Sequence, residues 1–99
     1  MRIVSRAALK AFWEQPKYRD AEQPLKAWFD ECKHADWKSS HDIKALYRHA
    51  SIVANNRAVF NIHGNKYRLI VAVNYQFSMC YIRFLGTHAE YDKVDASTI

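Results

Sequence analysis

The sequence has 99 residues, of which 49% are hydrophobic and 25% are charged, and its formal net charge is +5. This length allows one domain with one modest core, predicted over residues 1–99, and the composition excludes an extended disordered chain. The positive charge favours acidic partners, of which nucleic acid is the commonest, although no basic tail or block concentrates it and a mildly basic charge without functional meaning is the alternative.

The two cysteines, Cys32 and Cys80, fall in different predicted elements and lack the spacing of metal ligands. Neither a disulfide framework nor a zinc site is therefore expected. No apolar run is long enough to span a membrane, and the first residues lack the hydrophobic stretch of a signal peptide. We expect a cytoplasmic protein without membrane contact.

Two helices are predicted in the first third of the chain, after a short strand at residues 2–4. Ser5 is a good N-cap, and the segment that follows it to Glu14 has apolar residues at helical spacing, namely Ala8, Leu9, Phe12 and Trp13. Gln15-Pro16 should end this helix because the residue before a proline disfavours the α conformation. A second helix is predicted from Asp20, which can cap it, and its apolar stripe consists of Leu25, Trp28, Phe29 and Cys32.

The segment from residue 33 to residue 56 is less regular. Ser39 to Asp42 is typical of a helix start, and the apolar side of this short helix would be Ile43, Leu46 and Tyr47. Residues 50–56 lead into the first strand of a sheet. The basic residues of this part form either a positive rim or an ordinary solvated surface; they are His34, Lys38, His41, Lys44, Arg48, His49 and Arg57.

Three consecutive antiparallel strands are predicted in the second half, because three runs rich in Val, Ile, Tyr and Phe are separated by joints. The runs are Ala58–Ile62, Tyr67–Tyr75 and Met79–Leu85. The first joint, His63-Gly64-Asn65, suits a tight turn with positive φ, and the second, Asn74 to Ser78, is longer. The predicted fold is α+β with the order β-α-α-(short α)-β-β-β and a terminal turn or helix. Its small antiparallel sheet is packed on one face by the N-terminal helices.

Three polar residues interrupt the apolar strands: Asn61, Arg68 and Arg83. Because successive side chains of a strand alternate between faces, Arg68 shares a face with Ile70, Ala72 and Asn74. This face is predicted to be exposed to solvent. The opposite face of the same strand carries Tyr67, Leu69, Val71 and Val73.

The segment after the last strand, Gly86 to Lys93, places a histidine, a tyrosine, two acids and a lysine in one turn. Together with the cations of the sheet, this set suits cleavage of RNA without a metal. The 2′-hydroxyl of RNA is then the nucleophile, cations stabilise the charge on the phosphate, and groups of suitable pKa move protons. The chain has no glycine-rich loop and no metal-ligand spacing, so no cofactor and no metal are expected.

Each candidate residue also has a purely structural interpretation. Arg68 can pair with Glu90 or Asp92 at the sheet edge, and Arg83 can hold the terminal segment to the sheet. His88 can be a helix cap or a packed ring. Tyr91 can be a core aromatic, and Lys66 can be an ordinary solvated cation.

Two stretches resemble the HigB toxins of bacterial toxin–antitoxin systems, which belong to the RelE/ParE superfamily. They are Phe60–Ile70, which reads FNIHGNKYRLI, and Cys80–Asp92, which reads CYIRFLGTHAEYD. The resemblance is specific over residues 57–95 and agrees in element order over the rest. It implies a RelE-like fold and a ribosome-dependent messenger RNA endonuclease that acts in the A site of the 70S ribosome. It also implies a partner, a helix-turn-helix antitoxin similar to HigA that represses the operon.

The resemblance also implies roles for single residues. Arg68 would stabilise the scissile phosphate with the help of Lys66, and His88 stands where RelE has an arginine, with Tyr91 at the position of its tyrosine. RelE has a lysine at the position of Asn61, so the general base here is His88, Lys66 or Tyr91. We prefer His88 because the ordinary pKa of histidine is about 6.5. The implied RNA-binding residues are Asn61, Lys66, Arg83 and Lys93.

Two other functions fit the same architecture. A ParE-like protein would inhibit DNA gyrase by binding and would cleave nothing. An RNA-binding module without catalysis would keep its biological effect when His88 and Tyr91 are replaced. The proposed nuclease differs from both because it requires Arg68 and His88 for cutting.

Overall fold

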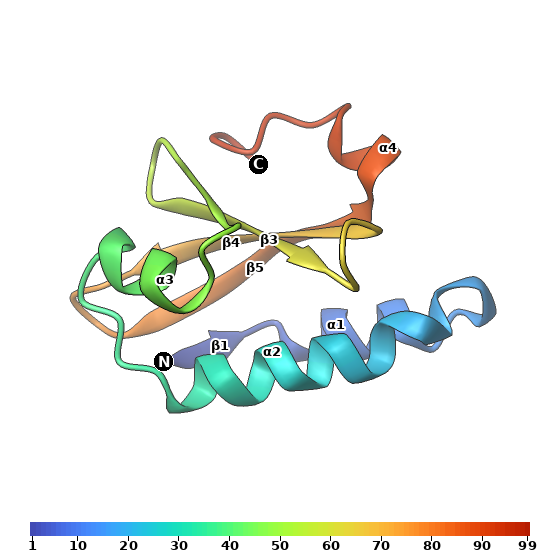
Figure 1. Cartoon of the computed structure of the whole chain (residues 1–99), viewed down its shortest axis with the longest axis horizontal. Coiled ribbons are helices and arrows are strands. Elements are labelled where there is room, and N and C mark those ends of the chain that lie inside the picture. Colours follow the sequence, from blue (N-terminus) through green and yellow to red (C-terminus); the bar gives the residue numbers. More distant parts are fainter.

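The structure is a computed structural model that describes residues 1–99. It has five strands and four α-helices, with a 3₁₀ helix, η1, between the first two α-helices (Figure 1). In chain order the elements are β1 (Arg2–Val4), α1 (Arg6–Trp13), η1 (Pro16–Ala21), α2 (Glu22–His34), α3 (Ser40–Leu46), β2 (Ser51–Val53), β3 (Arg57–Ile62), β4 (Tyr67–Asn74), β5 (Met79–Thr87) and α4 (His88–Tyr91). None of the helices is long and apolar enough to cross a membrane.

The strands form one sheet in the order β1-β5-β4-β3-β2. β1 runs parallel to β5, and the other neighbouring strands are antiparallel. The predicted α+β class and the three antiparallel strands of the second half are confirmed, with β3, β4 and β5 close to their predicted bounds. The sheet has one strand more than predicted, because residues 51–53 pair with β3 as a separate strand. The predicted strand at residues 2–4 forms the other edge and runs parallel to β5, so the sheet is mixed and not wholly antiparallel as predicted.

The predicted apolar stripes of the first two helices are buried at Leu9, Phe12, Leu25, Trp28 and Cys32, whereas Trp13 and Phe29 are partly buried and Ala8 is exposed. Two predicted caps are wrong. Ser5 precedes α1 with a left-handed φ of 73°, and its side chain makes no capping hydrogen bond. Asp20 lies inside η1, and α2 begins two residues later at Glu22. The Asp20 carboxylate binds Lys66 and Tyr67 at the distant β3–β4 hairpin instead of the nearby helix.

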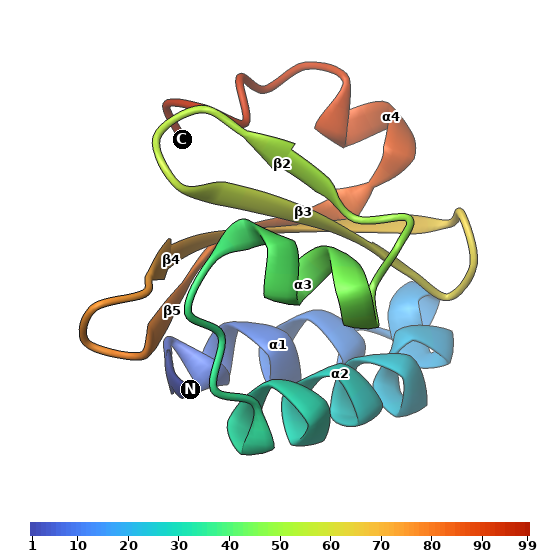
Figure 2. The same ribbon diagram turned by 60° about the vertical axis from the view of Figure 1, so that its left-hand side comes forward.

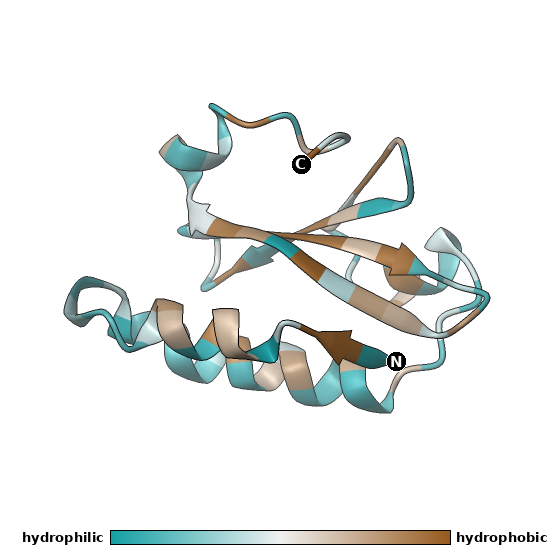
Figure 3. Ribbon diagram, turned by 180° about the vertical axis from the view of Figure 1, so that it is seen from behind, coloured by the Kyte–Doolittle hydropathy of each residue, from teal (hydrophilic) through white to brown (hydrophobic).

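The helices α1, α2 and α3 cover one face of the sheet, as Figures 1 and 2 show from two sides. Between the layers lies a core of 18 buried residues, in which Trp28 contacts Phe60 edge-on with 5.4 Å between the ring centroids. The strands are mostly hydrophobic in Figure 3, whereas α1 and α2 carry both polar and apolar residues. Full burial of a large apolar side chain contributes about 1.5–3 kcal/mol, so this layer supplies most of the stability.

The two cysteines lie side by side in this core. Cys32 of α2 and Cys80 of β5 are buried, free thiols whose sulfur atoms are 3.5 Å apart. The sequence could not predict this contact, because 48 residues separate the two cysteines and the contact depends on how α2 packs on the sheet.

The opposite face of the sheet is not the solvated face that strand alternation predicted. Ile70 is fully buried there, and Arg68 is only 8% exposed. The chain after β5 turns back over this face, as Figure 1 shows, and residues 94–99 with α4 cover it. A second, smaller core results, made of Val59, Ile70 and Ala96 with partly buried neighbours. The prediction was wrong because a terminal segment with few apolar residues can still cover a short strand.

Candidate active site

Arg68 is a buried cation that binds only neutral oxygen atoms. Its Nη1 donates to the main-chain carbonyl oxygens of Asn65 (3.0 Å) and Tyr67 (3.3 Å), and its Nη2 donates to Asn65 Oδ1 (2.6 Å). None of the ion pairs in the structure includes Arg68, so the predicted alternative of a pair with Glu90 or Asp92 is wrong. A guanidinium that is positioned but not neutralised retains its charge for an incoming anion.

Tyr91 of α4 lies against Arg68 of β4. The guanidinium carbon is 5.9 Å from the centroid of the tyrosine ring, within the range of a cation–π contact. Tyr91 is half-buried and packs on the smaller core formed by Val59 and Ile70. The ring therefore has a structural contact on one side and the arginine on the other.

The start of α4 places His88 and Tyr91 above the end of β4. Thr87 caps the helix: its Oγ1 accepts from the Glu90 main-chain nitrogen (3.2 Å), and its own main-chain nitrogen donates to Glu90 Oε1 (2.9 Å). These hydrogen bonds hold the pKa of Glu90 below its usual range. A capping box of this kind fixes the direction in which a short helix leaves a strand.

Gly86 makes this turn possible. It pairs with Arg68 across the strands, and a Cβ atom there would lie 2.8 Å from Phe84 Cζ and 3.0 Å from Glu90 Oε1. A larger residue would push the capping carboxylate and the phenylalanine ring apart. The glycine thus keeps α4 close to the arginine.

His88 has a carboxylate partner and an open side. Its Nδ1 lies 3.3 Å from Asp92 Oδ2, and both side chains are about half exposed. The main-chain nitrogen of His88 donates to the Lys66 carbonyl (3.3 Å), which ties α4 to the β3–β4 hairpin. Since Thr87 is the cap, His88 is not, and its ring is not packed in the core. Asp92 lies on the Nδ1 side of the ring, so Nε2 is the nitrogen that is left for a substrate.

Lys66 is not a free cation, because Asp20 of η1 binds it. The Asp20 carboxylate accepts from Lys66 Nζ and from the Tyr67 hydroxyl, and His63 Nε2 lies 3.7 Å away. These hydrogen bonds hold the pKa of Asp20 below its usual range, and the bond to Asp20 raises the pKa of Lys66. Asp20 joins the helical layer to the hairpin that carries Arg68. No local pattern signals this pair, because 46 residues separate its members.

Arg83 lies at an irregularity of β5 and holds the C-terminal segment. Ile70 pairs with Phe84 and Val71 with Ile82, so Arg83 is the extra residue of a β-bulge. Its Nε donates to the Ile99 carbonyl (3.1 Å), which also accepts from Arg57 Nη2 (3.0 Å). The structure therefore gives Arg83 the role of an anchor for the terminal segment, as the structural interpretation predicted.

The two other predicted RNA-binding residues flank Arg68. Asn61 is the cross-strand partner of Arg68 on β3; it is exposed, and its side chain makes no hydrogen bond. Lys93 is exposed just after α4, where its charge contributes to the lowered pKa of Glu90. Asn61, Arg68, Tyr91 and His88 thus surround one end of the sheet.

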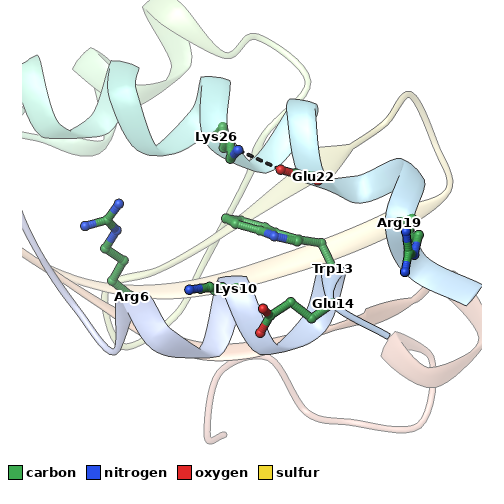
Figure 4. A pocket seen from close by; sticks show the side chains of 7 residues that line it. All are labelled: Arg6, Lys10, Trp13, Glu14, Arg19, Glu22 and Lys26. Carbon is green, nitrogen blue, oxygen red and sulfur yellow. Dashed lines mark hydrogen bonds and ion pairs between the residues drawn. The ribbon is translucent and has the colours of Figure 1, made fainter. Parts of the chain in front are cut away.

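Two hollows of about 580 Å³ each lie on the surface, one on either side of the main core. The first is between α1 and α2 and mixes four cations with two acids around Trp13, as Figure 4 shows. It contains none of the predicted site residues. The second lies beside the β3–β4 hairpin, and Asn61 and Asn65 belong to its wall. The segment Leu46–Ala50 forms most of the rest of that wall, together with Phe60 and Gly64. The sequence had indicated Arg48 and His49 only as part of a possible positive rim.

No group of three or more His, Cys, Asp or Glu side chains is arranged to hold a metal ion.

The mixed sheet with N-terminal helices and an arginine beneath a short C-terminal helix places the chain among small α+β toxins with a RelE-like fold. A family model described as the RelE-like toxic component of a toxin–antitoxin system, HigB_toxin, matches residues 21–94. The chain belongs to the HigB toxin family, and the predicted relationship is confirmed.

Three relatives carry names that describe an activity. The chain is 30% identical over 94 residues to the mRNA interferase toxin HigB of Escherichia coli (strain K12). The alignment covers 93% of this chain and 88% of that protein. The same values apply to proteins named mRNA interferase HigB in Escherichia coli O157:H7 and in Shigella flexneri.

Proposed function

We propose that this chain is the toxin of a toxin–antitoxin pair and acts as an mRNA interferase that cleaves messenger RNA during translation. The observation that carries the proposal is Arg68, a buried guanidinium without a carboxylate partner, located next to Tyr91 and on the same side as His88. The activity named for the relatives supports the same choice.

The proposed reaction uses the nucleophile that RNA itself contains. The 2′-oxygen forms a bond to the adjacent phosphorus while the bond from phosphorus to the 5′-oxygen of the next nucleotide breaks. The products are a 2′,3′-cyclic phosphate and a free 5′-hydroxyl. One group must take the 2′-hydroxyl proton, and another must give a proton to the leaving oxygen.

The site residues divide these tasks. His88, oriented by Asp92, takes the proton from the 2′-hydroxyl through Nε2. Arg68 stabilises the negative charge that develops on the phosphate, because its position is already fixed by Asn65. Tyr91 lies near both Arg68 and His88 and donates a hydrogen bond or a proton to the leaving 5′-oxygen. None of these steps requires a metal ion.

The dependence on the ribosome follows from how few free cations the site has. Asp20 neutralises Lys66, and Arg83 is held at the bulge by its hydrogen bond to the Ile99 carbonyl, so Arg68 and the exposed Lys93 are the cations left next to the phosphate. So few cations cannot hold a flexible RNA strand in a reactive geometry. We infer that the ribosome holds the messenger RNA, with the toxin in its A site, and that the toxin supplies the chemistry.

The partner that controls this activity is an antitoxin, as membership of a toxin–antitoxin family requires. We propose a helix-turn-helix protein similar to HigA and expect both proteins in the cytoplasm, where translation takes place. The net charge of +5 suits contact with ribosomal RNA.

The test is primer extension on messenger RNA from a translating extract, with the wild type, Arg68→Ala and His88→Ala. We expect new 5′ ends inside translated codons for the wild type and about a hundredfold fewer, or fewer still, for both variants, because removal of a charge-stabilising group or of a general base typically costs about that much. Arg2→Ala is the matched control, because Arg2 is an exposed arginine on the far edge strand.

Circular dichroism and thermal unfolding must show that both variants fold. Wild-type activity in folded Arg68→Ala would contradict the assignment of the site. Intact transcripts with the wild type, together with DNA damage in cells that express it, would support a ParE-like inhibitor of gyrase instead.

A further inference from the structure

A hollow opens beside the hairpin at the point where the sheet loses its edge strand. β2 pairs with β3 only from Arg57 to Val59, so Phe60 and Asn61 have no strand on that side. The segment Leu46–Ala50 passes there instead and leaves a hollow of about 580 Å³ between itself and the hairpin. The hollow is therefore a consequence of the short β2.

The hollow is directly connected to the proposed active site. Asn65 is part of its wall, and the Oδ1 atom of the same residue accepts from Arg68 Nη2 at 2.6 Å. Asn61, also in the wall, is the cross-strand neighbour of Arg68. A ligand in the hollow would thus lie next to a phosphate bound by Arg68.

The lining combines apolar surface, amides, an arginine and a histidine, and includes no carboxylate. Leu46 is 51% exposed although it is a large apolar residue, and the Tyr47 ring packs edge-on against Phe60 at 5.1 Å. Arg48 and His49 are on the rim and form no ion pair. The hollow between α1 and α2 differs in this respect, because Glu14 and Glu22 lie among its cations.

The wall opposite the hairpin is held in place before any ligand binds. Lys44 Nζ donates to the carbonyl oxygens of Arg48 and Ala50, both at 2.7 Å. The main-chain nitrogen of Ala50 donates to the Tyr47 carbonyl at 2.9 Å, and Ala50 itself is buried. Lys44, one of the basic residues of uncertain role in the sequence, thus shapes this turn, and the ordering cost of binding is reduced.

We propose that this hollow binds one unstacked base of the messenger RNA next to the cleaved bond. Leu46 and Tyr47 contact the face of the base, the side-chain amide of Asn61 hydrogen-bonds to its edge, and Arg48 and His49 bind the adjoining phosphate. Single-stranded RNA is recognised in this way, by apolar contact with a splayed base, polar contact with its edge and cations along the backbone. The inference rests on the proposed function and adds that this chain itself selects a base.

The absence of acidic residues favours RNA over the other possible occupant, a segment of the antitoxin. A phosphate next to a carboxylate is repelled, and this hollow has none. The Arg48 guanidinium and the His49 ring are free to meet a negative charge.

The experiment maps the 5′ ends that the protein produces across the transcripts of a translating extract. We expect wild-type cuts to favour one base at a fixed position beside the cut. In Leu46→Ala and in Asn61→Ala, cutting should fall most at sites with the favoured base, so that the preference decreases by about tenfold or more, the typical value of one specific base contact. In the double variant Arg48→Ala, His49→Ala, cutting should fall by about tenfold at all sites, with the preference kept, because phosphate contacts carry no sequence information.

Matched controls separate these effects from general surface changes. Phe77→Ala removes an exposed large apolar residue at the opposite end of the sheet, and Arg2→Ala removes an exposed arginine. Both should keep the wild-type pattern. Wild-type preference in Leu46→Ala and Asn61→Ala would overturn the inference, as would variants that keep their cutting pattern but escape the antitoxin.

Failure of the proposed function gives a different result, which is no cutting by the wild type. The hollow is then tested by nuclear magnetic resonance with a short oligoribonucleotide that carries 2′-O-methyl groups and resists cleavage. Shifts of the Leu46, Arg48 and Asn61 amide signals, weakened in Leu46→Ala, would support a base site. Signals that stay unchanged there would contradict it.

Discussion

The two faces of the sheet are built differently, and the difference separates stability from chemistry. One face is covered by three helices and a core of 18 buried residues. The other is covered by α4 and the residues after it, with a core of three buried residues. Arg68 and Tyr91 belong to the thin side, where a cation can stay close to solvent while the thick side keeps the strand in place.

The thin side explains why a buried arginine is tolerated. Burial of a charge is costly unless hydrogen bonds satisfy it, and three hydrogen bonds to neutral oxygens do so for Arg68. A carboxylate in their place would cancel the charge that the reaction needs. The β3–β4 hairpin supplies neutral acceptors through Asn65. The guanidinium is therefore oriented while its positive charge is not neutralised.

The largest expected effect is on the thick side. Trp28→Ala should reduce the free energy of unfolding by about 3–5 kcal/mol, because a 2% exposed aromatic side chain is replaced by a cavity. Denaturant unfolding followed by circular dichroism measures this loss. Trp13→Ala is the control, since Trp13 is only partly buried, in the hollow between α1 and α2 (Figure 4). Equal losses for both would contradict the assignment of the main core.

A smaller loss of stability but a clear loss of cutting is expected on the thin side. Ile70→Ala should cost about 2 kcal/mol, the lower end of the range for buried Ile, because the thin cover can relax into the space. Since Ile70 and Tyr91 belong to one cluster, Tyr91 and Arg68 should move apart. We expect cutting to fall by about tenfold at a temperature where the variant is fully folded, and primer extension measures it. Unchanged cutting would show that the cover does not position Tyr91.

The smallest effect concerns the link between the two layers and depends on pH. The pKa of Asp20 is lowered in the folded state, so its contribution to stability is present above its ordinary pKa of 3.8 and is lost as the pH falls below that value. Asp20→Asn should therefore lower the melting temperature at pH 7, and the difference from the wild type should shrink below about pH 4.

Melting curves at several pH values measure this difference. Asp36→Asn is the control, because Asp36 is paired with Lys38 only two residues away, and both are exposed. A constant difference between Asp20→Asn and the wild type from pH 7 to pH 3 would contradict a role for the charge of Asp20.

Several features could be predicted from the sequence because they depend on neighbours along the chain. Alternation and β-branched residues located β3, β4 and β5, and helical spacing located the stripes of α1 and α2. The predicted candidates Arg68, His88 and Tyr91 lie together at one end of the sheet. Their roles remain predictions until the variants are measured.

Other features could not be predicted, because they join residues that are far apart in the chain. Asp20 was expected to cap a helix, yet it binds Lys66, and Arg68 was expected on a solvated face, yet the C-terminal segment covers it. The bulge at Arg83 depends on the register between two strands, and the hollow beside Asn61 depends on where β2 ends.

The sequence by itself determined the class of fold, the family and the residue types available for chemistry, since these are encoded in local pattern and short motifs. The tertiary structure decided which cations are free. Lys66 is paired with the carboxylate of Asp20, 46 residues away in the chain, whereas Arg68 and Arg83 have only neutral partners. Charge is a property of the residue, but its neutralisation is a property of its neighbours in space, and packing chooses those neighbours.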